Sequence, residues 1–157
     1  MTTDQITAAG AVVDVMVGVG PRRARLLRKN KMRVPDPVHV RSVIDTGAGI
    51  SGFAGRVFRQ LELPPVGTIH ILTPSTPADQ PKECPLYDVT LYLVAGGAPR
   101  PVLESQVIAA EGWQPGKDEG IEGLLGRDIL AFSTLQYMGL DRTFTLAFRD
   151  CDPSLFG

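Results

Sequence analysis

Apolar residues alternate with polar or small ones along much of the chain, and this period of two is typical of β-strands. In AVVDVMVGV the alternation places valines on one face, at positions 13, 15, 17 and 19. The same period predicts strands in VGTIHIL, PLYDVTLYLV, PVLESQVIA and RTFTLAFRD, and a further strand that ends at Asp45. The polar, proline-rich TPADQPKE between the first two of these predicts a long β-hairpin with a mobile tip.

Helical spacing is confined to short segments. Pro21 can open a helix because its fixed φ suits the first turn, and Leu26 and Leu27 are the expected buried contact. Pro35 and Pro37 exclude a helix from the start of the next segment.

Two more short helices are expected. Phe53, Val57 and Leu61 lie at i, i+4 and i+8 and share one helical face. Farther on, a short apolar strand turns at Gly126, and Asp128 can cap the helix that follows. Strands outnumber helices and do not alternate regularly with them. This favours a mainly β barrel or sandwich with two or three short helices over a doubly wound sheet.

Length and composition bound the class of protein. The 157 residues suit a single domain over positions 1–157, with its core at roughly 11–150. The net charge of −1 gives no general attraction to nucleic acid or anionic membranes. No stretch is long and apolar enough to cross a membrane, and the N-terminus lacks the basic start of a secretory signal. Cys84 and Cys151 lack metal-type spacing, which favours a reduced, cytoplasmic protein without a metal, and a single disulfide stays open.

The segment VIDTGA places a carboxylate where a strand breaks into a tight turn. Gly47 and Gly49 let the backbone approach a ligand closely, and Thr46 can hold the loop through hydrogen bonds. A carboxylate fixed in this way suits acid–base work on a bound water. Peptide hydrolysis by this route needs two carboxylates that share one proton. No other aspartate has this setting, so the second must come from Asp45 of another copy across a two-fold axis.

Two motifs in order, VIDTGA and GLLGRDIL, with a hairpin between them, resemble the retropepsin-like aspartic proteases. The resemblance covers roughly Val13 to Phe148. It implies a retropepsin-like barrel, one lobe per chain, that forms a two-fold homodimer acting on peptides or proteins. It further implies an aspartic endopeptidase that needs no metal or cofactor.

The resemblance also implies roles for single residues. Asp45 is the catalytic carboxylate, and Thr46, Gly47 and Ala48 support the active-site loop, with Thr46 bonding across the two-fold axis. The second motif lies behind the loop and comprises Leu125, Gly126, Arg127 and Asp128. Gly126 allows close passage of the strand, and Arg127 is expected to tie the loop to the dimer interface by ion pairing. The candidates for a substrate-covering flap are Thr73, Pro74, Ser75 and Thr76.

The chain departs from the family at two places. Retroviral members carry an acidic residue after the alanine of the catalytic loop, where this chain has Gly49. The glycine-rich flap tip is replaced by the stiffer PSTPADQP. Both departures keep a second hypothesis open, in which the same dimer is catalytically idle and binds peptides or partner proteins.

The basic segment from Arg22 to Lys31 raises a third, weaker hypothesis. Gly18 and Gly20 before a basic helix resemble part of a DNA-binding helix–hairpin–helix. However, the preceding residues alternate as a strand does, and a solvated basic face is the simpler interpretation. Nucleic acid is therefore not an expected partner.

Overall fold

The computed structural model describes residues 1–72, 77, 79–95, 98–110 and 119–149. Its strands are β1 (Thr2–Thr7), β2 (Gly10–Val19), β3 (Val38–Ile44), β4 (Gly52–Phe53), β5 (Gly67–Ile71), β6 (Lys82–Ala95), β7 (Ala98–Ala109), β8 (Gly123–Leu125), β9 (Ser133–Met138) and β10 (Thr143–Phe148). Its helices are α1 (Pro21–Lys29), α2 (Gly55–Gln60) and α3 (Arg127–Leu130). Among the described residues, no helix combines the length and apolar character that crossing a membrane requires.

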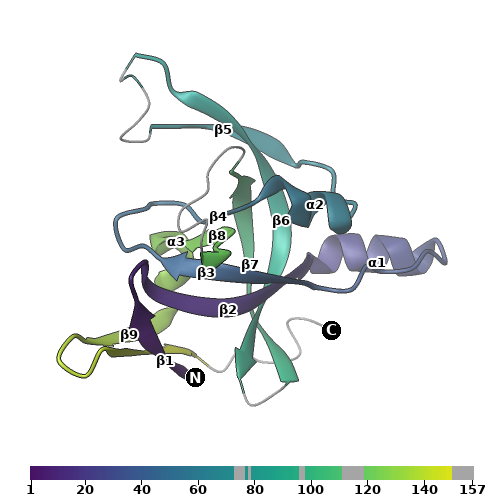
Figure 1. The fold of residues 1–157 in the computed structure, drawn as a ribbon. Helices are drawn as coiled ribbons and strands as arrows, with labels where there is room; N and C mark the ends of the chain where they lie inside the picture. Colours follow the sequence, from purple (N-terminus) through teal and green to yellow (C-terminus); the bar gives the residue numbers. More distant parts are fainter. Residues whose placement is uncertain (73–76, 78, 96–97, 111–118, 150–157) are drawn as a thin grey trace.

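The strands β2, β3, β8, β4, β7 and β6 pair in that order, and a pairing of β6 with β2 closes them into a barrel. Outside this ring, β5 pairs with the first residues of β6, and β1, β10 and β9 extend the sheet from β2. In Figure 1, β5 and the start of β6 project together from the barrel. The closed ring and the three short helices confirm the predicted mainly β barrel.

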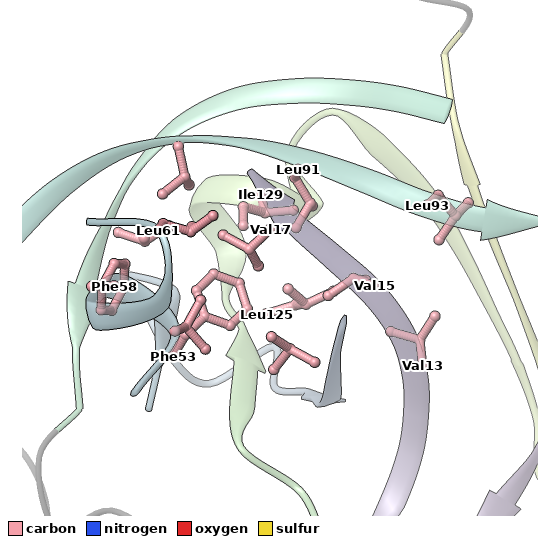
Figure 2. Close-up of a cluster of buried hydrophobic side chains, with 14 of the residues drawn as sticks. Val13, Val15, Val17, Phe53, Phe58, Leu61, Leu91, Leu93, Leu125 and Ile129 are labelled. Carbon is pink, nitrogen blue, oxygen red and sulfur yellow. The ribbon is translucent and has the colours of Figure 1, made fainter. Parts of the chain in front are cut away.

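The barrel interior is filled by the alternating apolar residues that the sequence indicated. Val13, Val15 and Val17 of β2 point inward beside Leu91 and Leu93 of β6 (Figure 2). The buried residues Phe53, Phe58, Leu61, Leu125 and Ile129 complete the cluster drawn there. Burial of this apolar surface is the main term that stabilises the barrel.

The helices differ in detail from the predictions. Leu27 is buried, as expected, but Leu26 is 49% exposed because it lies on the solvent side of α1. Phe53 belongs to β4, so the predicted second helix begins only at Gly55, although Val57 and Leu61 are buried as expected. The N-cap of α3 is Gly126, without a side-chain hydrogen bond, so the prediction that Asp128 caps this helix is wrong.

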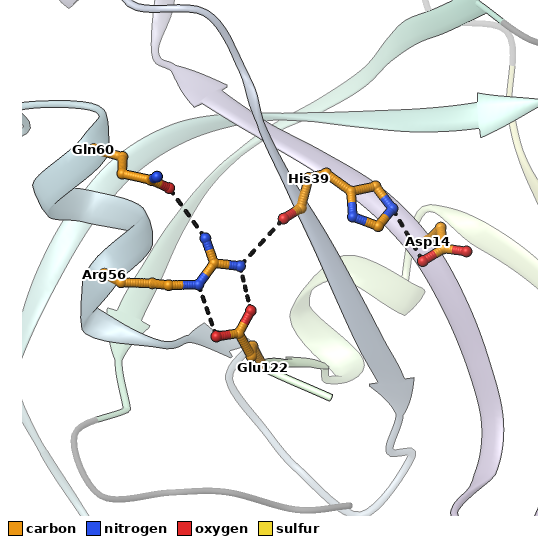
Figure 3. Close-up of polar contacts among 5 residues, drawn as sticks. All are labelled: Asp14, His39, Arg56, Gln60 and Glu122. Atoms are coloured by element: carbon orange, nitrogen blue, oxygen red, sulfur yellow. Dashed lines mark hydrogen bonds and ion pairs between the residues drawn. The ribbon is translucent and has the colours of Figure 1, made fainter. Parts of the chain in front are cut away.

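A bidentate ion pair ties α2 to the residue directly before β8. Figure 3 shows the Arg56 guanidinium against the Glu122 carboxylate, which lies directly before β8. Arg56 also donates to the side-chain oxygen of Gln60, at 3.0 Å, and to the backbone oxygen of His39, at 3.5 Å. This hydrogen bonding holds the pKa of Glu122 below its usual range and raises that of Arg56. The contact fixes the approach to β8, and therefore to the second motif.

Candidate active site

Strand β3 carries Asp45 to its position at the end of the barrel ring. Ile44 is paired with Leu125 of the parallel strand β8, and the Asp45 N–H donates to the Leu125 oxygen at 2.9 Å. The strand ends there, and the side chain of Asp45 is half-buried. Asp45 is therefore placed by strand pairing with the second motif, not by its own loop alone.

The turn after Asp45 fixes one oxygen of its carboxylate. The Gly47 N–H donates to Asp45 Oδ1 at 2.8 Å, and the Ala48 N–H donates to the Asp45 backbone oxygen at 3.2 Å. This is the local bonding by which aspartate stabilises a turn two residues ahead. Thr46 and Gly47 are exposed, so the loop presents its tip outward.

Arg127 holds the same loop from behind. Its Nη1 donates to the backbone oxygens of Thr46, at 2.9 Å, and Gly47, at 2.8 Å. Its backbone N–H donates to the Ala48 oxygen at 2.9 Å. Within the described part of the chain, the partners of Arg127 are carbonyl groups and no carboxylate pairs with it. The ion pair expected from the family resemblance stays a prediction about a partner chain.

Gly126 sits where the loop and the second motif cross. A Cβ at this residue would lie 2.9 Å from the Ala48 oxygen and 3.0 Å from the carbonyl carbon and oxygen of Ile50. These are backbone atoms of the loop that follows Asp45, so they cannot swing aside as a flexible side chain would. The close crossing therefore requires glycine.

Ser51 and Asp128 form a second link to this loop, which was not predicted from the sequence. The Asp128 carboxylate accepts from the Ser51 N–H at 2.9 Å and from its hydroxyl at 2.6 Å. The Ser51 Oγ in turn accepts from the Gly126 N–H at 2.8 Å. Ser51 is completely buried, and the contact joins residues that are 77 positions apart. No local sequence pattern predicts a side-chain contact between residues this far apart in the chain.

The predicted flap is described only at its base. The hairpin of β5 and β6 runs to the pair Ile71 and Lys82. Thr73, Pro74, Ser75 and Thr76 lie outside the described residues, so their assignment to the flap stays a prediction.

The surroundings of Asp45 in one copy of the chain can be compared with the other carboxylates and hollows that the structure describes. Within the described residues, the Asp45 carboxylate accepts from the Gly47 N–H, whereas the Asp128 carboxylate accepts from Ser51 and Asp88 lies within β6. Two hollows, of about 520 and 350 Å³, both adjoin α1 and neither is lined by Asp45. Among the described residues, no group of three or more His, Cys, Asp or Glu side chains is arranged to hold a metal.

Cys84 is poorly suited to act as a nucleophile. It is a free thiol, buried in β6, and burial raises its pKa. A raised pKa disfavours the reactive thiolate at neutral pH. Cys151 lies outside the described residues.

No protein-family model matches the chain, and no curated protein does. Among solved structures, the chain is similar to a retropepsin-like aspartic protease from Rickettsia conorii, with a TM-score of 0.49 and 14% sequence identity. The similarity covers 94% of this chain and 89% of that one.

Proposed function

We propose that the chain is an aspartic-type endopeptidase that works as a two-fold homodimer, with the two copies of Asp45 in one active site. The observation that carries the proposal is the anchoring of Asp45. Its strand pairs with β8, its Oδ1 accepts from Gly47, and Arg127 holds the turn by two carbonyl groups. A general acid or base has to be held in register with its substrate, and this loop provides that rigidity.

The proposed reaction uses a water molecule and no covalent intermediate. One Asp45 is ionised and the other is protonated, because two carboxylates this close share a single proton. The ionised carboxylate takes a proton from the water as its oxygen attacks the scissile carbonyl carbon. The protonated carboxyl gives its proton to the carbonyl oxygen, which yields a neutral tetrahedral diol. Collapse of the diol breaks the C–N bond, with a proton passing to the leaving amine, and the dyad returns to its single shared proton.

In the proposed dimer, each copy also supplies groups that contact the substrate and the loop of the partner. Gly47 is exposed and lacks a side chain, so a substrate backbone can lie against the loop. Thr46 is exposed at the turn, where its hydroxyl can bond to the loop of the partner. The hairpin of β5 and β6 would cover the substrate and exclude water.

The first test is cleavage of a diverse peptide mixture, read by mass spectrometry from acidic to neutral pH. Wild type and Asp45→Asn are compared at concentrations that favour a dimer. Asparagine keeps an Oδ1 that can accept from Gly47, so the variant should fold while losing the ionisable group. Asp141→Asn, in the exposed turn between β9 and β10, is the matched control and should cleave as wild type does.

Mixing wild type with excess Asp45→Asn tests the shared site. If copies pair at random, activity falls with the square of the wild-type fraction, because a mixed pair holds one ionisable carboxylate. A fall in direct proportion to that fraction would show that each chain works alone and would contradict the dimeric site.

The idle binding module is the second candidate, and Gly49 is the observation that favours it. Its predicted result is saturable peptide binding without cleavage in wild type. Equal cleavage by wild type and Asp45→Asn would instead remove Asp45 from the mechanism altogether.

A further inference from the structure

The larger hollow of the molecule is a groove of about 520 Å³ at the start of α1, away from Asp45. Helix α1 begins against β6, where a Cβ on Gly20 would come within 3.4 Å of the Asp88 backbone oxygen. The pairing of Val17 with Val38 puts this end of β2 beside the first residue of β3, whereas Asp45 follows its last. Seven residues of strand separate the two ends by roughly 20 Å. Figure 1 shows α1 at one end of β3 and the following loop at the other.

Part of the lining of the groove is basic. Arg22, Arg23 and Arg25 line it from α1. Within the described residues, none of the three forms an ion pair. The Nε of Arg23 is buried and has no hydrogen-bond partner among the described residues. The guanidinium groups of the three arginines offer N–H donors with which an anionic group in the groove can form charge-assisted hydrogen bonds.

The floor of the groove is apolar and exposed. Leu26 and Val66 line it with 49% and 51% of their surfaces exposed, and half-buried Leu63 lies with them. Three apolar side chains grouped in one concave site form a surface that a partner can cover favourably. The exposure of Leu26, which the helical pattern assigned to the core, is explained if this side of α1 serves binding.

Two acidic residues of the lining restrict the kind of ligand. Asp88 and Glu104 line the groove from β6 and β7. A nucleic acid carries a phosphate at every nucleotide, so it would also set negative charge against these two carboxylates. A peptide can place an acidic side chain against the arginines and turn uncharged or basic groups toward Asp88 and Glu104.

We propose that this groove binds a peptide segment of a partner protein that carries an acidic side chain next to an apolar one. The acidic group contacts the three arginines, and the apolar side chain packs on Leu26, Leu63 and Val66. The binding is independent of peptide hydrolysis at Asp45.

Fluorescence anisotropy tests the proposal with a labelled peptide that alternates Glu and Leu in a Gly-Ser background. Two comparison peptides replace each Glu by Gln or each Leu by Ser, and a labelled single-stranded oligonucleotide is the fourth probe. The protein is the 157-residue chain with Asp45→Asn, which cannot consume the peptide under the proposed mechanism. The assay therefore measures binding without cleavage whether or not the chain is a peptidase, and the variants of the groove lining locate the binding away from Asp45.

Two variants with the same loss of charge separate the groove from general electrostatics. Arg22→Gln/Arg25→Gln changes the groove wall, whereas Lys29→Gln/Lys31→Gln changes exposed positions at the far end of α1. We expect about tenfold weaker binding of the Glu–Leu peptide for the arginine pair and less than about twofold for the lysine pair.

Leu26→Ala should also weaken binding, while Leu140→Ala, at a fully exposed turn, should not. Four outcomes would overturn the proposal. They are no binding of the Glu–Leu peptide, equal binding of the Gln or Ser peptide, equal effects of the two charge variants, or tighter binding of the oligonucleotide.

Discussion

Asp128→Ala removes three hydrogen bonds at the base of the candidate active-site loop. The carboxylate accepts from the Ser51 N–H, from the Ser51 hydroxyl and from the Ile129 N–H, at 2.9, 2.6 and 2.8 Å. The Ile129 N–H also reaches the Gly126 oxygen at 3.2 Å, so it keeps an acceptor in the variant. The Ser51 N–H keeps none in the part of the chain that the structure describes, and Ser51 has no exposed surface.

The expected loss of stability follows from these contacts. A buried donor left without an acceptor costs about 1–3 kcal/mol, and bonds to a charged acceptor lie at the upper end. With the N–H orphaned and the hydroxyl free to reorient, we expect Asp128→Ala to lower the free energy of unfolding by about 2–4 kcal/mol. Asp128→Asn keeps one acceptor oxygen and should cost about half as much.

Urea unfolding of the purified protein measures these values. Asp141→Ala, at an exposed turn, should change the free energy of unfolding by less than about 0.5 kcal/mol and serves as the control. A double-mutant cycle with Ser51→Ala isolates the shared contact, since the two changes should cost less together than the sum of their separate effects. A loss below about 1 kcal/mol for Asp128→Ala, or strictly additive effects, would refute the reasoning.

Two further changes test other contacts of the site. Gly126→Ala should destabilise the fold by about 1–3 kcal/mol and abolish any Asp45-dependent cleavage, because its Cβ would lie 2.9 Å from the Ala48 backbone oxygen. Gly139→Ala, whose Cβ would lie 3.8 Å from its nearest neighbour, is the control for both the urea unfolding and the peptide cleavage measurements. Arg56 holds the pKa of Glu122 below its unfolded value, so the stability from this pair is present above the unfolded pKa and is lost as pH falls through the folded one. Urea midpoints between about pH 6 and pH 3 should therefore fall less in Glu122→Gln than in wild type, and the difference should be small because both side chains are more than a third exposed.

Strands in which apolar residues repeat at every second position were predictable from the sequence. In β2 the alternate valines at 13, 15 and 17 are all buried, because a strand with one face on the core must repeat every two residues. The position of Asp45 directly after β3 was predictable for the same reason, since the apolar run of that strand ends one residue before it.

Elements held by distant partners were not predictable. Strand β1 is polar, and it exists because it pairs with β10, where the hydroxyls of Thr3 and Thr145 lie 2.9 Å apart. Strand β9 carries apolar residues whose spacing also suits an extension of α3, and pairing with β10 selects the strand. Propensity is a weak guide at such positions because tertiary contacts decide between the two structures.

Substitutions at Gly49 test how the loop after Asp45 is held. Retroviral enzymes carry an acidic residue at this position of the loop, and this chain carries glycine. A Cβ at Gly49 would meet nothing closer than Arg127 Nη2, at 3.6 Å, so Gly49→Asp would bring a carboxylate to a guanidinium that is exposed and already oriented. Gly49→Ala measures the change in unfolded-chain entropy alone. We expect the aspartate variant to exceed the alanine variant in free energy of unfolding by about 0.2–1 kcal/mol at low salt, as for other exposed pairs. The excess should vanish in about 1 M salt and in an Arg127→Gln background. An excess that survives either change would mean that the new carboxylate bonds to the loop backbone, and that the two carbonyl contacts already satisfy Arg127.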